Sequence, residues 1–358
     1  MSSAEPKLYL LLISVHGLIR GHDLELGRDA DTGGQTLYVV ELARALGRCA
    51  EVERVDLVTR RIVDPDVSAD YAQREEQLSD KARIVRIDCG PDGYIAKERL
   101  WDHLDAFADN LVQWIRARPR MPDFVHSHYA DAGYVGVRLT HLAAVPLVHT
   151  GHSLGRDKRM QLLAKGLSGK AIETAYRMRR RINAEEEVLA NADLVITSTR
   201  NEIEVQYGQY DYYDPDCMAV IPPGTDLELF RPPEPGDSFD ILKKLQPFLR
   251  DPGKPLVLAL SRPDERKNIP MLLEAFHASP ELREAANLLI IAGNRDDVRD
   301  LDPGAQEVLT TLLLLVDAYD LYGSVALPKR HNADEIPEVY RAAFASGGVF
   351  INPALTEP

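Results

Sequence analysis

The chain has 358 residues, and at about 150 residues per domain this length suggests two domains. Its 42 lysines and arginines against 56 aspartates and glutamates give a formal net charge of −14, which argues against nucleic acid or a membrane surface as the main partner. A hydrophobic content of 45% with 27% charged residues is typical of a globular protein and excludes a disordered or fibrous one.

The cysteines and the first apolar run favour a cytoplasmic protein. Cys49, Cys89 and Cys217 are far apart, and their spacing matches neither a disulfide framework nor a zinc site. The run from Leu8 to Val15 is too short for a membrane span or a signal peptide. We therefore expect it to be the first strand of a sheet.

Short apolar runs alternate with stretches of helical period in the first half of the chain, which is typical of a parallel sheet with crossover helices. One helix is predicted from the apolar spacing between Val39 and Leu46, with Gly47 ending it. A second is predicted from the stripe between Leu100 and Trp114. The strands expected here are Leu8 to Ser14, Val52 to Val58, Ile84 to Ile87, Phe124 to His126, Leu147 to Thr150 and Leu194 to Thr197.

A stretch rich in proline, from Pro222 to Pro255, separates this half from a second alternating segment. We expect an N-terminal domain over 1–222, a linker over 223–255 and a C-terminal domain over 256–358. The elements expected in the second half are strands at Leu256 to Leu260, Leu288 to Ala292, Ser324 to Leu327 and Val349 to Ile351, and helices from Ile269, around Glu307 to Tyr319 and around Ile336 to Ala345.

A glycine pair lies in the loop before the first predicted helix, within Asp31-Thr32-Gly33-Gly34-Gln35. Glycines there let a ligand approach the backbone closely, and a helix N-terminus favours a phosphate or sugar anion. A flexible loop that needs glycine for its turn is an equal alternative on these residues alone.

Positive charges cluster at two places in this acidic chain. Arg177, Arg179, Arg180 and Arg181 crowd one helix after the basic stretch from Gly151 to Lys158, and together they could bind a phosphate. The alternative is a solvated helix face on which the arginines pair with Glu185, Glu186 and Glu187.

The second basic cluster follows the first strand of the second half. There Arg262 and Lys267 could clamp a diphosphate leaving group, because neutralising developing charge is the main demand of such a transfer. Surface charge on a loop is the alternative.

Other polar pairs carry little weight. Three Asp-x-Asp pairs, at residues 29 and 31, 64 and 66, and 214 and 216, have the spacing of metal ligands, but three occurrences in an aspartate-rich chain indicate chance. His126 and His128 could share one side of a strand end, yet no third ligand is evident. We predict no metal site and no cofactor.

Long motifs across the chain resemble the glucosyltransferase domain of the sucrose-phosphate synthase family. The first is ISVHGLIRGHDLELGRDADTGGQTLYVVELARAL over residues 13–46. The others are GHSLGRDK from 151, AVIPPG from 219, SRPDERKN from 261, GNRDD from 293, DLYGSVALPK from 320 and GVFINPALTEP from 348.

The resemblance implies an α/β protein of the GT-B fold, with two Rossmann-like domains whose parallel sheets face an interdomain cleft. It implies a retaining transferase that moves glucose from UDP-glucose to fructose 6-phosphate, giving sucrose 6-phosphate and UDP. The implied acceptor-binding residues are Gly33, Gln35, Lys97, Tyr129, Ser153, Lys158, Arg180 and Arg181; the implied donor-binding residues are Gly34, Arg262, Lys267 and Glu357; and the implied catalytic residues are His152, Arg262, Lys267 and Glu357.

The resemblance ends abruptly, because Glu357 matches the first glutamate of a family motif and the chain stops one residue later. We therefore expect an incomplete second domain. The alternatives are a catalytically impaired sugar-phosphate-binding fragment, or a transferase like sucrose synthase that uses free fructose or another nucleotide sugar. Beyond its substrates, the expected partner is a sucrose-phosphate phosphatase.

Overall fold

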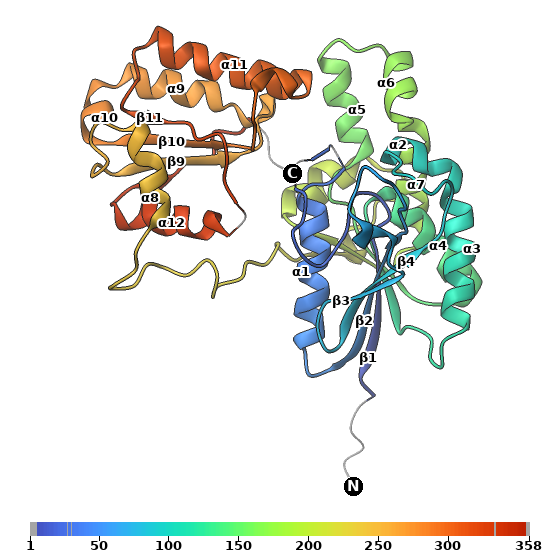
Figure 1. Ribbon diagram of the computed structural model, residues 1–358. Helices are drawn as coiled ribbons and strands as arrows, with labels where there is room; N and C mark the ends of the chain where they lie inside the picture. The colour runs from blue at the N-terminus through green and yellow to red at the C-terminus, as the bar shows by residue number, and fades with distance from the viewer. Residues whose placement is uncertain (1–5, 27, 30, 333, 356–358) are drawn as a thin grey trace. The chain divides into compact units, whose positions relative to one another are not determined.

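The computed structural model describes residues 6–26, 28–29, 31–332 and 334–355. They form two compact units, the first extending to Pro223 and the second beginning at Gly224. Each unit has its own sheet, covered by helices on both faces (Figure 1). The fold class is therefore α/β, as the alternation of strand and helix patterns predicts.

The described part of the first unit holds an eight-stranded sheet in the order β3-β4-β2-β1-β5-β6-β7-β8. All neighbouring strands are parallel except β3, which runs antiparallel to β4. The strands are β1 Leu8–Ile13, β2 Val52–Arg60, β3 Glu75–Gln77, β4 Ala82–Ile87, β5 Phe124–His128, β6 Leu147–Thr150, β7 Leu194–Thr197 and β8 Met218–Val220.

Strand β1 explains why its sequence is an unbroken apolar run. Leu11 and Ile13 pack into the core that helices α3, α4 and α7 cover, whereas Leu10 and Leu12 pack on the opposite face beneath α1. A parallel strand buried on both faces has no reason to alternate with polar residues. The helices of this unit are α1 Gly34–Arg48, α2 Lys97–Leu100, α3 Leu104–Arg116, α4 Ala130–Ala143, α5 Gly155–Ala164, α6 Gly169–Tyr176 and α7 Met178–Asn191.

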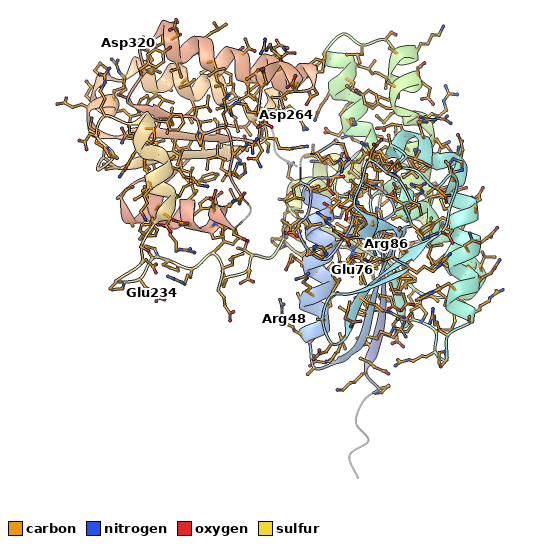
Figure 2. The ribbon with its side chains drawn as sticks, viewed as in Figure 1. Arg48, Glu76, Arg86, Glu234, Asp264 and Asp320 are labelled. Atoms are coloured by element: carbon orange, nitrogen blue, oxygen red, sulfur yellow. The ribbon has the colours of Figure 1, made fainter. Side chains whose placement is uncertain are left out.

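The polar edge strand β3 is held by charge rather than by apolar burial. The side chain of Arg86 on β4 is fully buried and its Nη2 lies 2.5 Å from Oε2 of Glu76 on β3; both residues are labelled in Figure 2. Because burying one charge alone is costly, this pair helps fix the register between the two strands.

The second unit has a parallel sheet in the order β11-β10-β9-β12 within its described residues. Helices α9 and α11 cover one face, and α8 and α12 cover the other (Figure 1). The elements are β9 Leu256–Ser261, β10 Asn287–Ala292, β11 Val325–Ala326, β12 Val349–Phe350, α8 Asp240–Leu245, α9 Ile269–Ala278, α10 Pro280–Ala285, α11 Pro303–Ala318 and α12 Glu335–Ala345.

Two local expectations need revision. Gly47 does not end the first helix, because α1 continues to Arg48; instead a Cβ at Gly47 would lie 2.9 Å from Oγ of Ser79, so the residue allows close packing.

The proline-rich stretch 223–255 contains helix α8, whose Ile241 and Leu245 are buried in the core of the second unit. We propose that the connecting segment is confined to the residues before α8.

Helix α4 packs closely on its surroundings at a glycine. A Cβ on Gly133 would lie 2.5 Å from Cγ2 of Val188 on α7 and 3.1 Å from Cε1 of His149 on β6. The contact with Val188 is shorter than atoms tolerate and the contact with His149 is tight, so a side chain here must displace Val188 on α7.

We expect Gly133→Ala to lower the free energy of unfolding by about 1–3 kcal/mol, the usual cost of overpacking a core. Chemical denaturation followed by circular dichroism measures this change. The control is Gly169→Ala at the start of α6, where no heavy atom lies within 4 Å of the new Cβ. An equal effect of the two substitutions would contradict the packing argument.

Candidate functional site

A pocket in the first unit brings together side chains from several separate segments: α2 and the turn after it, the end of β5 with the start of α4, and helices α5, α6 and α7. Four of the residues that the sequence predicts for acceptor binding line it: Lys97, Tyr129, Lys158 and Arg181. The other lining residues are Glu98, Trp101, Asp131 and Tyr176. Three cations in one pocket are notable in a chain of net charge −14, and they favour an anionic ligand.

Lys97 is held by carboxylates. Its Nζ pairs with Asp31 and lies 3.3 Å from Oε1 of Glu98, while its backbone N–H donates to Oδ2 of Asp31 at 2.8 Å. Burial alone would lower the pKa of Lys97, but the Asp31 carboxylate outweighs it and the pKa is raised. Lys97 is therefore a fixed positive charge at neutral pH.

Lys158 enters the pocket from α5. Its Nζ lies 4.4 Å from the centre of the Tyr176 ring, which belongs to α6. A cation over an aromatic face is attracted by the ring's quadrupole. This contact places the ammonium group on the side of the pocket that α6 forms.

The two neighbouring arginines of α7 differ. Arg181 lines the pocket and is 4% exposed. Arg180 is not among the lining residues; its Nη1 lies 2.7 Å from Oδ1 of Asp102, and its Nη2 donates to the carbonyl of Trp101 at 2.7 Å. Its side chain is 39% exposed. The predicted role of Arg180 stays a prediction.

The glycine pair lies at the N-terminus of α1. Gly33 is the N-cap residue, and Gly34 begins the helix, with no atom within 4 Å of where a Cβ would stand. Gln35 extends its Nε2 to Oγ of Ser14 at 3.2 Å and to the carbonyl of His128 at 3.4 Å. The helix start thus presents open space and backbone donors beside the carboxyl ends of β1 and β5.

Four histidines gather at the carboxyl ends of β5 and β6: His126, His128 and His149 are buried, and His152 is half-buried. Nδ1 of His128 is 3.0 Å from Nε2 of His152, Nε2 of His126 is 2.9 Å from Oγ1 of Thr150, and His149 pairs with Ser127. His152 has a φ of +57°, an uncommon conformation for a residue with a side chain. The contact with His128 helps hold it there.

The histidines of this cluster are neutral. Desolvation lowers the pKa of His126 to about 4 and that of His149 and His152 to about 3, and the pKa of His128 also falls well below its usual value. Among the described residues, no group of three or more histidine, cysteine, aspartate or glutamate side chains is arranged to hold a metal ion.

The three Asp-x-Asp pairs have a local explanation. In each, the first carboxylate accepts a hydrogen bond from the backbone N–H of the second aspartate, at 2.8 Å for Asp31, 2.9 Å for Asp66 and 3.1 Å for Asp216. This is the geometry of an Asx turn. The spacing reflects turn formation.

The predicted donor residues of the second unit follow β9. Arg262 is exposed, Lys267 is half-buried, and Asp264 between them, labelled in Figure 2, caps a short helical turn. Glu357 lies outside the described residues. Arg295 was not predicted as a site residue; it is 6% exposed and donates to the carbonyls of Leu327 and Pro328, both at 3.2 Å.

Other residues of the first-unit pocket also escaped the sequence analysis. Asp131 is 1% exposed, and its Oδ2 lies 2.7 Å from Nδ1 of His16. Trp101 and Tyr176 supply aromatic walls. One signal could have found Asp131: a charged residue a few positions after a predicted buried strand, where parallel sheets place their ligand sites.

A family model described as a glycosyl transferase 4-like domain matches residues 33–224, more than half of the chain. The chain therefore belongs to this glycosyltransferase family. Within the described residues, no helix combines the length and apolarity needed to cross a membrane.

Curated relatives extend the match over almost the whole chain. Sucrose-phosphate synthase of Zea mays is 46% identical over 99% of this chain, and probable sucrose-phosphate synthase 2 of Craterostigma plantagineum is 44% identical over 100% of it. The matched part makes up 39% of the maize protein and 40% of the Craterostigma protein. The predicted resemblance to this family is confirmed.

Solved structures show the same fold. Sucrose-phosphate synthase from Thermosynechococcus elongatus is 27% identical, with a TM-score of 0.69 over 98% of this chain and 77% of that chain. The catalytic domain of starch synthase IV from Arabidopsis thaliana, bound to ADP and acarbose, is 13% identical with a TM-score of 0.62, covering 98% of this chain and 79% of that one, and supports the fold alone. The predicted GT-B fold of two Rossmann-like domains is confirmed.

The depressed pKa values of the histidines predict acid lability. Each histidine binds a proton in the unfolded chain below about pH 6.5 but stays neutral in the folded protein down to about pH 4 or lower. The unfolded state therefore binds more protons, and stability falls as pH drops from 6.5 to 4.5, by up to about 1.4 kcal/mol per pH unit for each histidine.

We expect His149→Gln to reduce the pH dependence of the free energy of unfolding by the equivalent of about one bound proton. Urea unfolding at pH 7.0, 6.0, 5.5 and 5.0 measures the slope for each protein. His22→Gln at an exposed site is the control, because His22 is 59% exposed. Parallel curves for wild type and His149→Gln would show that His149 is not buried in its neutral form.

Proposed function

We propose that the protein transfers glucose from UDP-glucose to fructose 6-phosphate with retention, releasing UDP and sucrose 6-phosphate. The convergence of Lys97, Lys158 and Arg181 on one pocket of the first unit carries this proposal. The identity to plant sucrose-phosphate synthases over nearly the whole chain supports the choice of substrates. We assign the pocket to the acceptor's phosphate, and Gly33, Gln35 and Ser153 to the sugar beside it.

Arg181, rather than Arg180, is the guanidinium that we place on the phosphate, because Arg181 lines the pocket whereas Arg180 binds Asp102 and the Trp101 carbonyl. The pocket's carboxylates are already engaged. Asp131 lies against His16, and Glu98 lies near Lys97. They therefore repel an incoming phosphate less than isolated carboxylates would.

In this proposal the protein supplies position and charge rather than a nucleophile. The anomeric hydroxyl of fructose 6-phosphate forms a bond to C1 of glucose on the face from which UDP departs, and the bond from C1 to the diphosphate breaks. The hydroxyl proton passes to the leaving diphosphate. By resemblance to the family, Arg262 and Lys267 neutralise that diphosphate, the backbone at Gly34 binds it, and His152 and Glu357 hold the transferred glucose.

We also propose a partner enzyme and a cellular location for this reaction. The product is a phosphate monoester of a disaccharide, so a sucrose-phosphate phosphatase is a fitting partner. All three cysteines are unpaired thiols, which fits a cytoplasmic location. Assay of nucleoside diphosphate release from UDP-glucose with fructose 6-phosphate tests the activity, with free fructose and ADP-glucose as parallel arms; absence of release from UDP-glucose with fructose 6-phosphate would refute the proposal.

Lys158→Ala should raise the KM for fructose 6-phosphate by about 10- to 100-fold, because a charge-assisted contact to phosphate contributes about 1.5–3 kcal/mol. The KM for UDP-glucose should change little. The control is Arg159→Ala on the next position of α5, an exposed residue that does not line the pocket. Similar effects of both substitutions would remove Lys158 from the acceptor site.

The donor assignment has its own test. Arg262→Ala should weaken UDP binding about tenfold or more in isothermal titration calorimetry, since one charge-assisted contact to the diphosphate is lost. Arg266→Ala is the matched control in the same loop, where the arginine pairs with Asp264 at 3.1 Å. Equal weakening by both would indicate a general charge effect.

A further inference from the structure

Glu185 on α7 is buried beneath the pocket without lining it. Its side chain is 4% exposed, and three groups donate to its carboxylate. Nε of Arg181 lies at 2.9 Å, the backbone N–H of Gly155 lies 3.0 Å from both oxygens, and the hydroxyl of Tyr210 lies at 2.5 Å. The carboxylate thus accepts hydrogen bonds from three separate elements of the first unit.

Glu185 leaves one end of the Arg181 guanidinium available for a ligand. Nε binds Glu185, and Nη2 donates to the carbonyl of Ser153 at 2.6 Å and to its Oγ at 3.2 Å. The guanidinium also lies 4.6 Å from the centre of the Tyr129 ring. None of the hydrogen bonds among the described residues uses Nη1. Arg181 is therefore oriented before a ligand arrives.

The same carboxylate also fixes the start of α5, the helix that carries Lys158. Gly155 is the first residue of α5, and its N–H has no partner within the helix. A Cβ on Gly155 would lie 2.7 Å from Oε2 of Glu185, so only glycine allows this approach. Glu185 thus acts on two of the pocket's cations. It binds Arg181 directly, and through Gly155 it fixes the start of the helix that carries Lys158 one turn later.

We propose that Glu185 is a positioning residue that sets recognition of the sugar phosphate, by holding Arg181 and the N-terminus of α5 in their binding geometry. The inference rests on the proposed function, because it assigns the pocket to a phosphate monoester. Glu185 itself touches no substrate. Its effect reaches the ligand through the guanidinium and through the helix.

Glu185→Gln is the informative substitution because it keeps the size of the side chain. The amide oxygen can still accept from Gly155 or from Tyr210, but the amide group cannot neutralise Arg181. We expect the dissociation constant for fructose 6-phosphate to rise about 10- to 100-fold. The kcat and the KM for UDP-glucose should stay within about twofold, and the preference for fructose 6-phosphate over fructose should fall.

Glu186→Gln is the matched control. Glu186 is the next residue of α7 and also pairs with an arginine, at 2.5 Å from Nη2 of Arg156, but Arg156 does not line the pocket. The side chains of Arg156 and Glu186 are 31% and 13% exposed, so a partly buried ion pair is lost there as well. If loss of stability alone were responsible, both variants would change acceptor binding to the same extent.

The experiment measures binding of fructose 6-phosphate, fructose and inorganic phosphate by calorimetry, with unfolding midpoints as the fold check. If wild-type protein binds no sugar phosphate, the proposed function fails, and this inference fails with it. If wild type binds but Glu185→Gln binds equally well with the same preference, only the inference is overturned.

A milder variant keeps the inference testable should Glu185→Gln fail to fold. Tyr210→Phe removes one donor to Glu185 and retains the aromatic ring. We expect it to weaken fructose 6-phosphate binding by several-fold and to leave the KM for UDP-glucose unchanged. Unaltered acceptor binding in this variant would overturn the proposal in the same way.

Discussion

A cationic side chain that is buried in a protein to bind phosphate needs a counter-ion before the phosphate binds. Lys97 and Arg181 are both largely removed from solvent, and each has a carboxylate of the protein as its counter-ion, Asp31 for the lysine and Glu185 for the arginine. Removing such a charge from water without a partner would cost several kcal/mol. The arrangement of the first unit around α2, α5 and α7 depends on meeting that requirement.

The parallel sheet provides the location at which polar and charged side chains can gather. Its strands are covered on both faces, so polar side chains gather where the strands end. The glycine pair before α1 and the histidines after β5 and β6 lie at those carboxyl ends. The histidines stay uncharged there, which leaves the positive charge to the lysines and arginines.

Most of the fold could be predicted from the sequence, because both faces of the central strands are buried and their runs are nearly continuous. The elements that were not predicted from the sequence are short or polar. Strand β3 is Glu75–Gln77, and an ion pair holds it rather than apolar contacts. Helix α8 lies among prolines, and its two buried residues, Ile241 and Leu245, give too few positions to reveal a period.

The site was predictable only in part. Lys97, Lys158 and Arg181 came from the resemblance and meet in one pocket. The pairing of arginines with the Glu185 to Glu187 run also occurs, but the Arg181–Glu185 pair is buried, whereas the sequence suggested a solvated face. In a chain with 56 acidic residues, nothing in the pattern distinguishes the one carboxylate that lies beneath the pocket.

The order of the first sheet has a consequence for synthesis of the chain. Strand β1 pairs with β5, with Leu10 opposite Phe124, so one side of this apolar strand has no neighbour until more than a hundred further residues have been made. At about 5–20 residues per second, that delay lasts roughly 6 to 20 s. During that interval the apolar run LYLLLI lacks one of its two neighbouring strands.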